Sequence, residues 1–207
     1  MLRKIRLIAA TLCFVLITLL FLDFTGTLHG WFGWLAKIQF LPAVLAFNVG
    51  VVLFLVLLTL AFGRVYCSVI CPLGVFQDVV ARIGRRGKKL PYSYSPALSW
   101  LRYGVLFVFV LALVAGVGSL VALLAPYSAY GRIANNLFQP LWMWGNNLFA
   151  YLAARVESYA FYEVDVWMKS LPTFLAALAT LVVLVVLAWR NGRTYCNTIC
   201  PVGTVLG

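Results

Sequence analysis

The chain has 207 residues, of which 64% are hydrophobic and only 10% are charged, and its mean hydropathy is +1.01. This composition excludes an ordinary soluble domain and is typical of an integral membrane protein. The formal net charge is +11. Membrane topology and anionic lipid account for this charge without a nucleic-acid partner, because the basic residues gather in only some of the connections.

Four apolar segments are long enough to cross a hydrocarbon core, which takes about 20 residues. They cover residues 7–22, 41–62, 103–125 and 171–189. The first follows three basic residues, as a signal peptide would, but the bulky residues after it offer no small-residue cleavage site. We therefore expect an uncleaved first span and a single all-α membrane domain, residues 1–207, with four transmembrane helices.

The basic residues predict the orientation of these spans. Twelve of the 16 lie in the N-terminus, at residue 64, at residues 82–102 and at residues 190–193, with Asp78 as the only acid on that side. The other two connections hold four basic and four acidic residues. Because short cytoplasmic loops carry the excess of Lys and Arg, we expect both termini on the cytoplasmic side of a bacterial inner membrane.

One cysteine motif occurs twice, at residues 63–76 and 192–205, after the second and fourth spans. The copies read GRVYCSVICPLGVF and GRTYCNTICPVGTV, and eight of the 14 positions are identical. Both copies fall on the expected cytoplasmic side, so spans two and four run in the same direction. The chain is thus predicted to form two parallel helical hairpins that each end in this motif.

The connection between spans three and four is long and rich in aromatic residues. A fifth span there would be costly because of its polar side chains, and it would place the second motif on the wrong side. We expect one or two helices lying flat at the outer membrane interface. A quinone pocket beneath them is an alternative use of the aromatic residues, which are Tyr127, Tyr130, Phe138, Trp142, Trp144, Phe149, Tyr151, Tyr159, Phe161, Tyr162 and Trp167.

Four of the five cysteines belong to the repeated motif, and four thiolates are a full ligand set for an iron–sulfur cluster or a tetrahedral metal ion. The Pro after the second cysteine of each pair predicts that the helix unwinds there, which exposes backbone N–H groups to the sulfurs. The bacterial ferredoxin cluster run also ends in Cys-x3-Cys-Pro. The predicted metal ligands are Cys67, Cys71, Cys196 and Cys200.

Residues beside the cysteines have two interpretations each. Arg64 and Arg193 can stabilise thiolates or anchor the ends of spans, and Tyr66 and Tyr195 can anchor at the interface or donate hydrogen bonds to sulfur. A disulfide is disfavoured on a reduced cytosolic face, whereas structural zinc is a serious alternative. Cys13, inside the first span, is predicted to serve packing.

Two further groups of polar residues are candidates for a specific role. His29, the only histidine, lies with Asp23 in the first outer connection, where the pair could accept protons from a quinol. The alternative for His29 is an ordinary loop position at the headgroup level. Asn48, in the middle of the second predicted span, indicates an interhelical hydrogen bond.

The chain resembles the membrane portion of the polyferredoxin family, which includes the nitrous-oxide reductase regulatory protein and the quinol-dehydrogenase subunit of periplasmic nitrate reductase. The resemblance rests on residues 66–74 and 195–203, with residues 37–42 as a further match. It implies a 4Fe–4S cluster and electron transfer between quinol and ferredoxin-type carriers. Family members usually continue into a domain with ferredoxin cluster runs. We expect this sequence to be the membrane portion of such a protein; alternatively, the other clusters belong to a partner.

These observations predict an electron-transfer component rather than a self-contained enzyme. It would relay electrons between quinol or a membrane partner and cytoplasmic iron–sulfur carriers, with membrane lipid around it. Two other functions fit the cysteines: a maturation factor that handles copper or iron, and a structural subunit with a zinc clasp.

Overall fold

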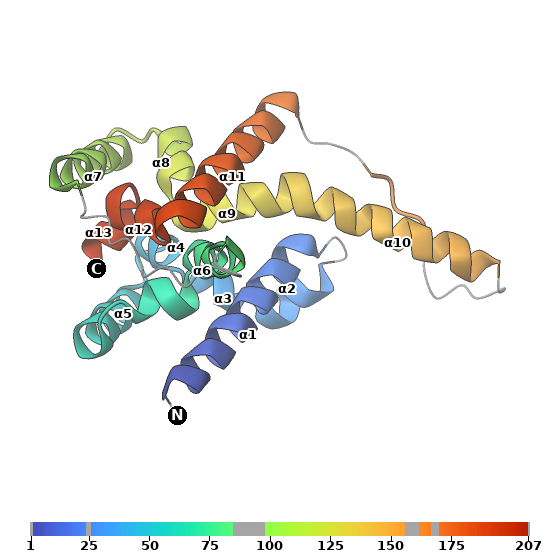
Figure 1. Cartoon of the computed structure of the whole chain (residues 1–207), viewed down its shortest axis with the longest axis horizontal. Helices are drawn as coiled ribbons and strands as arrows, with labels where there is room; N and C mark the ends of the chain where they lie inside the picture. The colour runs from blue at the N-terminus through green and yellow to red at the C-terminus, as the bar shows by residue number, and fades with distance from the viewer. Residues whose placement is uncertain (1, 24–25, 85–97, 156–161, 167–169, 207) are drawn as a thin grey trace.

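The computed structural model describes the chain except for residues 1, 24–25, 85–97, 156–161, 167–169 and 207. All regular structure in the described residues is helical (Figure 1). The helices are α1 (Leu2–Leu22), α2 (Thr27–Phe32), α3 (Trp34–Lys37), α4 (Phe40–Leu45), α5 (Val49–Phe62), the π-helical η1 (Tyr66–Ile70), α6 (Pro72–Gly84), α7 (Ser99–Val114), α8 (Gly118–Leu124), α9 (Pro126–Ile133), the π-helical η2 (Ala134–Phe138), α10 (Gln139–Ala154), α11 (Leu171–Asn191), α12 (Thr194–Thr198) and α13 (Pro201–Val205). The all-α expectation is confirmed.

Two of the described helices are long and apolar enough to cross a membrane. They cover Lys4–Leu22 and Leu171–Arg190, each with a mean hydropathy of 2.6. Only 17% of each apolar window is buried within the protein. The core helix of a soluble protein would be mostly covered, so these exposed apolar faces indicate membrane association.

The second and third predicted spans are each divided into two helices. The main helices, α5 with 14 residues and α7 with 16, would each rise only about 21–24 Å, less than the roughly 30 Å of a hydrocarbon core. The break follows α4 in the first case and precedes α8 in the second. Hydropathy alone therefore predicted continuous segments where the chain turns.

Both breaks have the same hydrogen-bonded geometry. Phe47 and Gly116 take positive φ angles of 51° and 71°. The N–H of Asn48 donates to the carbonyl of Ala43 at 2.9 Å, and Val117 donates to Ala112 at 2.9 Å, which is the bond of a Schellman helix stop. The Asn48 side chain then accepts from the N–H of Val51 at 3.4 Å. Asn48 thus caps α5, and within the described part of the chain its side chain makes no interhelical bond of the kind that we expected.

The connection between the third and fourth predicted spans contains one long helical run, in which α9, η2 and α10 follow one another directly. In Figure 1 this run crosses the molecule, and α10 extends beyond the body on the side away from α5 and α7. The side chains of Trp142, Trp144, Phe149 and Tyr151 are exposed along α10. Helical structure was expected here, and its position at a membrane interface stays a prediction. Tyr159, Phe161 and Trp167 lie outside the described residues.

The core of the protein gathers around α6, which contacts α11, α1, η1 and α9. Its largest cluster of buried residues includes Leu55, Leu73, Tyr130 and Leu184 together with three of the motif cysteines. The two motifs are therefore in the best-packed part of the protein, between the two long apolar helices.

Candidate metal centre

Each motif begins where a long helix stops at a glycine. Gly63 ends α5 with φ 67° and ψ −140°, and Gly192 ends α11 with φ 74° and ψ −115°. These backbone angles lie in the region that only glycine occupies readily. The glycine that opens both copies of the motif is thus required to redirect the chain toward the cysteines.

The second cysteine of each pair has nearly the same backbone conformation in the two copies. Cys71 has φ −77° and ψ 115°, and Cys200 has φ −72° and ψ 117°. The proline that follows excludes helical geometry at the cysteine and begins the next helix, as the sequence predicted. The N–H of Cys71 donates to the carbonyl of Tyr66 at 2.9 Å, and that of Cys200 donates to Tyr195 at 3.0 Å.

The second glycine of the motif is needed for a close approach of two backbone segments. A Cβ atom on Gly74 would lie 2.0 Å from the carbonyl oxygen of Cys67, and one on Gly203 would lie 2.3 Å from that of Cys196. The structural role of these glycines is to let the helix that begins at the proline of each motif pack directly on the first cysteine.

The structure brings the four motif cysteines into one buried group. Their exposed fractions lie between 2% and 8%, and each thiol is close enough to the other three to interact with them electrostatically. Burial raises the pKa of all four thiols, and it raises the pKa of Cys200 to about 12. Cys13 lies in α1 and is half-buried.

Hydrogen-bond donors surround the sulfurs. The N–H of Gly203 donates to Sγ of Cys200 at 3.3 Å, and the N–H groups of Leu73 and Gly74 stabilise the Cys71 thiolate in the same way. The Gln77 side-chain amide donates to Sγ of Cys196 at 3.4 Å. Gln77 is fully buried, and its Oε1 has no hydrogen-bond partner among the described residues. Sequence reasoning missed Gln77, although a glutamine on the apolar face of α6 was a visible signal.

Charged residues connect the two motifs to each other. The Arg193 guanidinium, from the second copy, forms an ion pair with Asp78 in the helix after the first copy, with Nε 2.6 Å from Oδ1. Arg64, from the first copy, donates to Oδ1 of Asn197 in the second at 3.2 Å. Both arginines lower the pKa of the Cys67 thiol, although burial outweighs them. The predicted arginines are thus close enough to favour thiolates.

The motif tyrosines are buried and reach the neighbouring helices. The Tyr66 hydroxyl donates to Oε1 of Gln39 at 3.2 Å and accepts from the N–H of Phe40 at 3.1 Å. Tyr195 lies in the field of Arg132, whose positive charge partly offsets the rise that burial causes in the tyrosine pKa. Tyr66 therefore fixes the start of α4 instead of donating to a sulfur.

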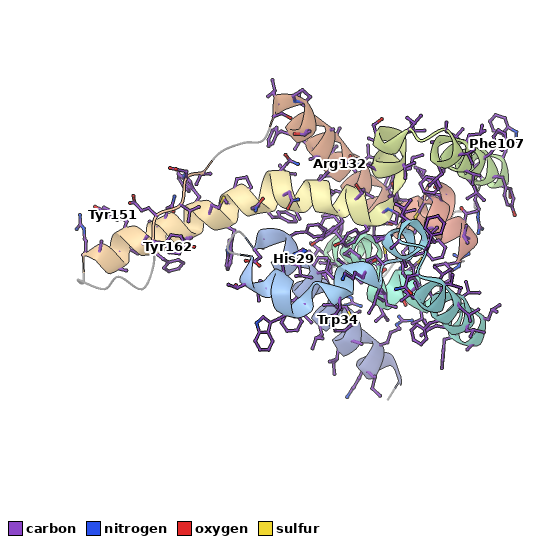
Figure 2. The ribbon with its side chains drawn as sticks, turned by 180° about the vertical axis from the view of Figure 1, so that it is seen from behind. His29, Trp34, Phe107, Arg132, Tyr151 and Tyr162 are labelled. Atoms are coloured by element: carbon purple, nitrogen blue, oxygen red, sulfur yellow. The ribbon has the colours of Figure 1, made fainter. Side chains whose placement is uncertain are left out.

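Asp23 and His29 lie together at the start of α2. The Asp23 carboxylate accepts from the N–H groups of Gly26, Leu28 and His29 at 2.9–3.2 Å. This carboxylate therefore caps the short helix, while the His29 side chain is exposed (Figure 2). The capping role gives Asp23 a structural purpose that the sequence did not reveal. A role in quinol oxidation stays a prediction.

The four motif thiols and the N–H groups around them form the candidate donor set. Among the described residues, no three His, Cys, Asp or Glu side chains are close enough together to hold a single metal ion. The four thiols are nevertheless buried within one another's electrostatic fields, with N–H donors directed at the sulfurs. Four buried thiols with N–H donors beside them are a ligand set that an iron–sulfur cluster would accept.

Comparison with known proteins agrees with this chemistry. Residues 44–91 and 173–207 match the 4Fe-4S binding domain family, and each matched segment contains one cysteine motif. The expected iron–sulfur cofactor is confirmed at the level of this family match. No curated protein and no solved structure matches the chain.

Proposed function

We propose that the protein is a membrane electron-transfer module of the polyferredoxin type, with one 4Fe–4S cluster held by Cys67, Cys71, Cys196 and Cys200. The observation that supports this most strongly is the convergence of two copies of one motif on a single buried group of four thiols. When bound, the cluster would supply a one-electron acceptor and donor. The backbone and Gln77 N–H groups would set its potential.

The proposed topology has four membrane crossings, with both termini and the cluster on the cytoplasmic side. Two long apolar helices and the distribution of basic residues support it. The other two crossings would be made by the interrupted pairs α4–α5 and α7–α8.

The proposed donor is quinol, and the proposed acceptor is a ferredoxin-type iron–sulfur carrier on the cytoplasmic side. One quinol that is oxidised to quinone releases two electrons and two protons. The electrons would leave singly and reduce two one-electron acceptors, and the protons would pass to solvent. Burial of the ligands favours this function over transient metal delivery, because a client protein could not reach the thiols.

The test is anaerobic purification in detergent, with iron and sulfide content, visible absorption and EPR recorded before and after dithionite. We expect four iron and four sulfide per chain, broad brown absorption and a signal on reduction. The double variant Cys67→Ser/Cys196→Ser should lose the cluster, whereas the control Cys13→Ser should keep it. A colourless protein with stoichiometric zinc or copper would overturn the proposal, as would a full cluster signal in the double variant.

A further inference from the structure

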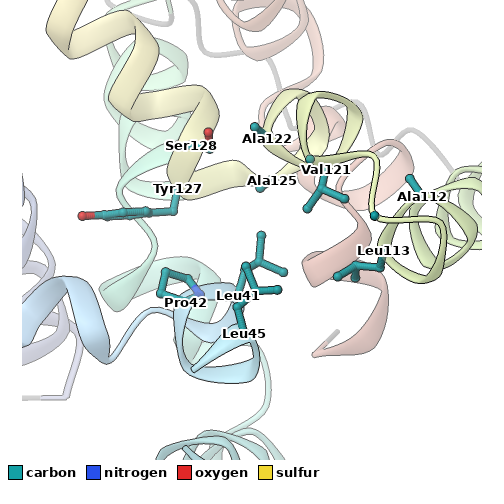
Figure 3. A pocket seen from close by; sticks show the side chains of 12 residues that line it. Leu41, Pro42, Leu45, Ala112, Leu113, Val121, Ala122, Ala125, Tyr127 and Ser128 are labelled. Atoms are coloured by element: carbon teal, nitrogen blue, oxygen red, sulfur yellow. The ribbon is translucent and has the colours of Figure 1, made fainter. Parts of the chain in front are cut away.

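Two neighbouring cavities share part of their lining, and they differ in the other side chains that line them. An apolar cavity of about 410 Å³ lies between the two interrupted helix pairs, lined by residues such as Leu41, Leu45, Leu113 and Val121 (Figure 3). A polar cavity of about 400 Å³ lies between α9, η2 and the start of α11, lined by Arg132, Asn135, Asn136 and Thr173. Tyr127 and Ser128 line both cavities.

We propose that the two cavities together bind one prenylated quinol, with its ring in the polar cavity and the first part of its tail in the apolar cavity. This inference rests on the proposed function, because it locates the donor of that function. The pairing of a polar and an apolar cavity through two shared residues suits a ligand with a ring that carries oxygens and a hydrocarbon tail.

The free hydrogen-bonding capacity of Arg132 favours a neutral oxygen over a phosphate. Its two terminal nitrogens already donate to the carbonyls of Ala122 at 2.9 Å and Leu123 at 3.1 Å. These two bonds engage both terminal nitrogens, which a bidentate lipid phosphate would use. Nε is buried and has no hydrogen-bond partner among the described residues. One buried N–H suits one quinol or quinone oxygen, and the lining residues of both cavities include no carboxylate.

Both cavities are connected to the cysteines through the motif tyrosines. Arg132, at the junction of α8, α9 and α11 in Figure 2, acts electrostatically on Tyr195, which precedes Cys196. On the other side, Tyr66 precedes Cys67 and bonds to Gln39 and Phe40, next to the cavity-lining Leu41. The lining of the polar cavity is thus linked to Tyr195, and that of the apolar cavity to Tyr66, and each tyrosine directly precedes a proposed ligand.

Two substitutions should close the site while leaving the cluster intact. Gly118 lines the apolar cavity, has open space where a Cβ atom would lie and has no positive φ, so Gly118→Phe can place a ring in the tail cavity. Asn135→Leu removes an amide from the polar cavity at similar volume. Gly104→Phe is the matched control, because Gly104 also has open space but lines neither cavity.

The assay is photolabelling of the cluster-loaded protein in nanodiscs with an azido-benzoquinone that carries a decyl tail, followed by peptide mapping. We expect label within residues 122–136, reduced at least tenfold in Gly118→Phe and in Asn135→Leu and unchanged in Gly104→Phe. Iron content and the dithionite-reduced EPR signal should be the same in all four proteins. Wild-type labelling in both cavity variants would overturn the proposal, as would label that phosphatidylglycerol displaces and decyl-quinol does not.

Cluster reduction by decyl-quinol is measured separately, so that the two proposals can fail independently. Label in the expected peptide without cluster reduction would preserve the binding site and refute quinol as the electron donor. Reduction of the cluster with label elsewhere would preserve the donor and refute this site.

Discussion

An alanine in place of Gly74, the second glycine of the first motif, should disturb the metal centre although it adds only one methyl group. The Cβ of Gly74→Ala would lie 2.0 Å from the carbonyl oxygen of Cys67, whereas such contacts are essentially never shorter than 3.0 Å. The two backbone segments must therefore separate by about 1 Å, and overpacking of a dense core typically costs about 1–3 kcal/mol. Because the displaced carbonyl belongs to a proposed ligand, we expect cluster loss as well as destabilisation.

Two other glycines provide the comparison: Gly203, at the same place in the second copy of the motif, and Gly104, which has open space where a Cβ atom would lie. In Gly203→Ala the same contact would be 2.3 Å, so the required movement and the loss of stability should be somewhat smaller. Gly104→Ala, inside α7 with no atom near a Cβ, should instead stabilise the protein by about 0.5–1 kcal/mol.

The measurement is iron per chain together with thermal unfolding followed by circular dichroism in detergent. We expect the order of Tm to be Gly104→Ala, wild type, Gly203→Ala and Gly74→Ala, from highest to lowest, with iron reduced in the last two. Full iron content and a wild-type Tm in Gly74→Ala would refute the close-approach explanation of this glycine.

Three further outcomes follow from the same site. Gln77→Leu removes the N–H that donates to Sγ of Cys196, so the reduction potential of the cluster should become more negative. An EPR-monitored redox titration measures this potential, and an unchanged value would contradict the role of the bond. Asp78→Asn weakens the partly exposed ion pair with Arg193, and urea or SDS unfolding should show a loss of about 1 kcal/mol or less, with the cluster retained. The metal-free protein should lose stability as the pH rises from about 9 toward about 12. Burial raises the pKa of the Cys200 thiol to about 12 in the folded protein, whereas in the unfolded chain this thiol releases its proton from about pH 9. A Tm of the metal-free protein that does not fall between about pH 8 and about pH 10.5 would refute this linkage.

The cysteine motif was predictable from sequence because its geometry is encoded locally. A proline fixes the conformation of the residue before it, so the extended backbone of Cys71 and Cys200 followed from Pro72 and Pro201 alone. Convergence of the two copies was an expectation, because both were predicted to lie at the same ends of helices that run in parallel. The cofactor class followed from the four thiols and agrees with the family match.

The helix breaks and the buried polar contacts were not predictable in the same way. Hydropathy averages over a window and does not detect a Schellman stop, especially at Phe47, which is not a glycine yet has a positive φ. Gln77 lies outside both copies of the cysteine motif, and the partners of Gln39 and Gln77 lie far away along the chain, at Tyr66 and Cys196. Such contacts depend on the packing of helices and not on local sequence.

The exchange of contacts between the two motifs explains why they belong to one chain. The helix after the first copy supplies the Gln77 amide to Cys196 and the Asp78 carboxylate to Arg193, and the second copy supplies Asn197 to Arg64. Cys196 thus receives a donor, and Arg193 a counter-charge, from the other half of the repeat. We therefore infer that the site forms only when α6 and α11 pack together, so that cluster binding would stabilise their contact across more than 100 residues of sequence.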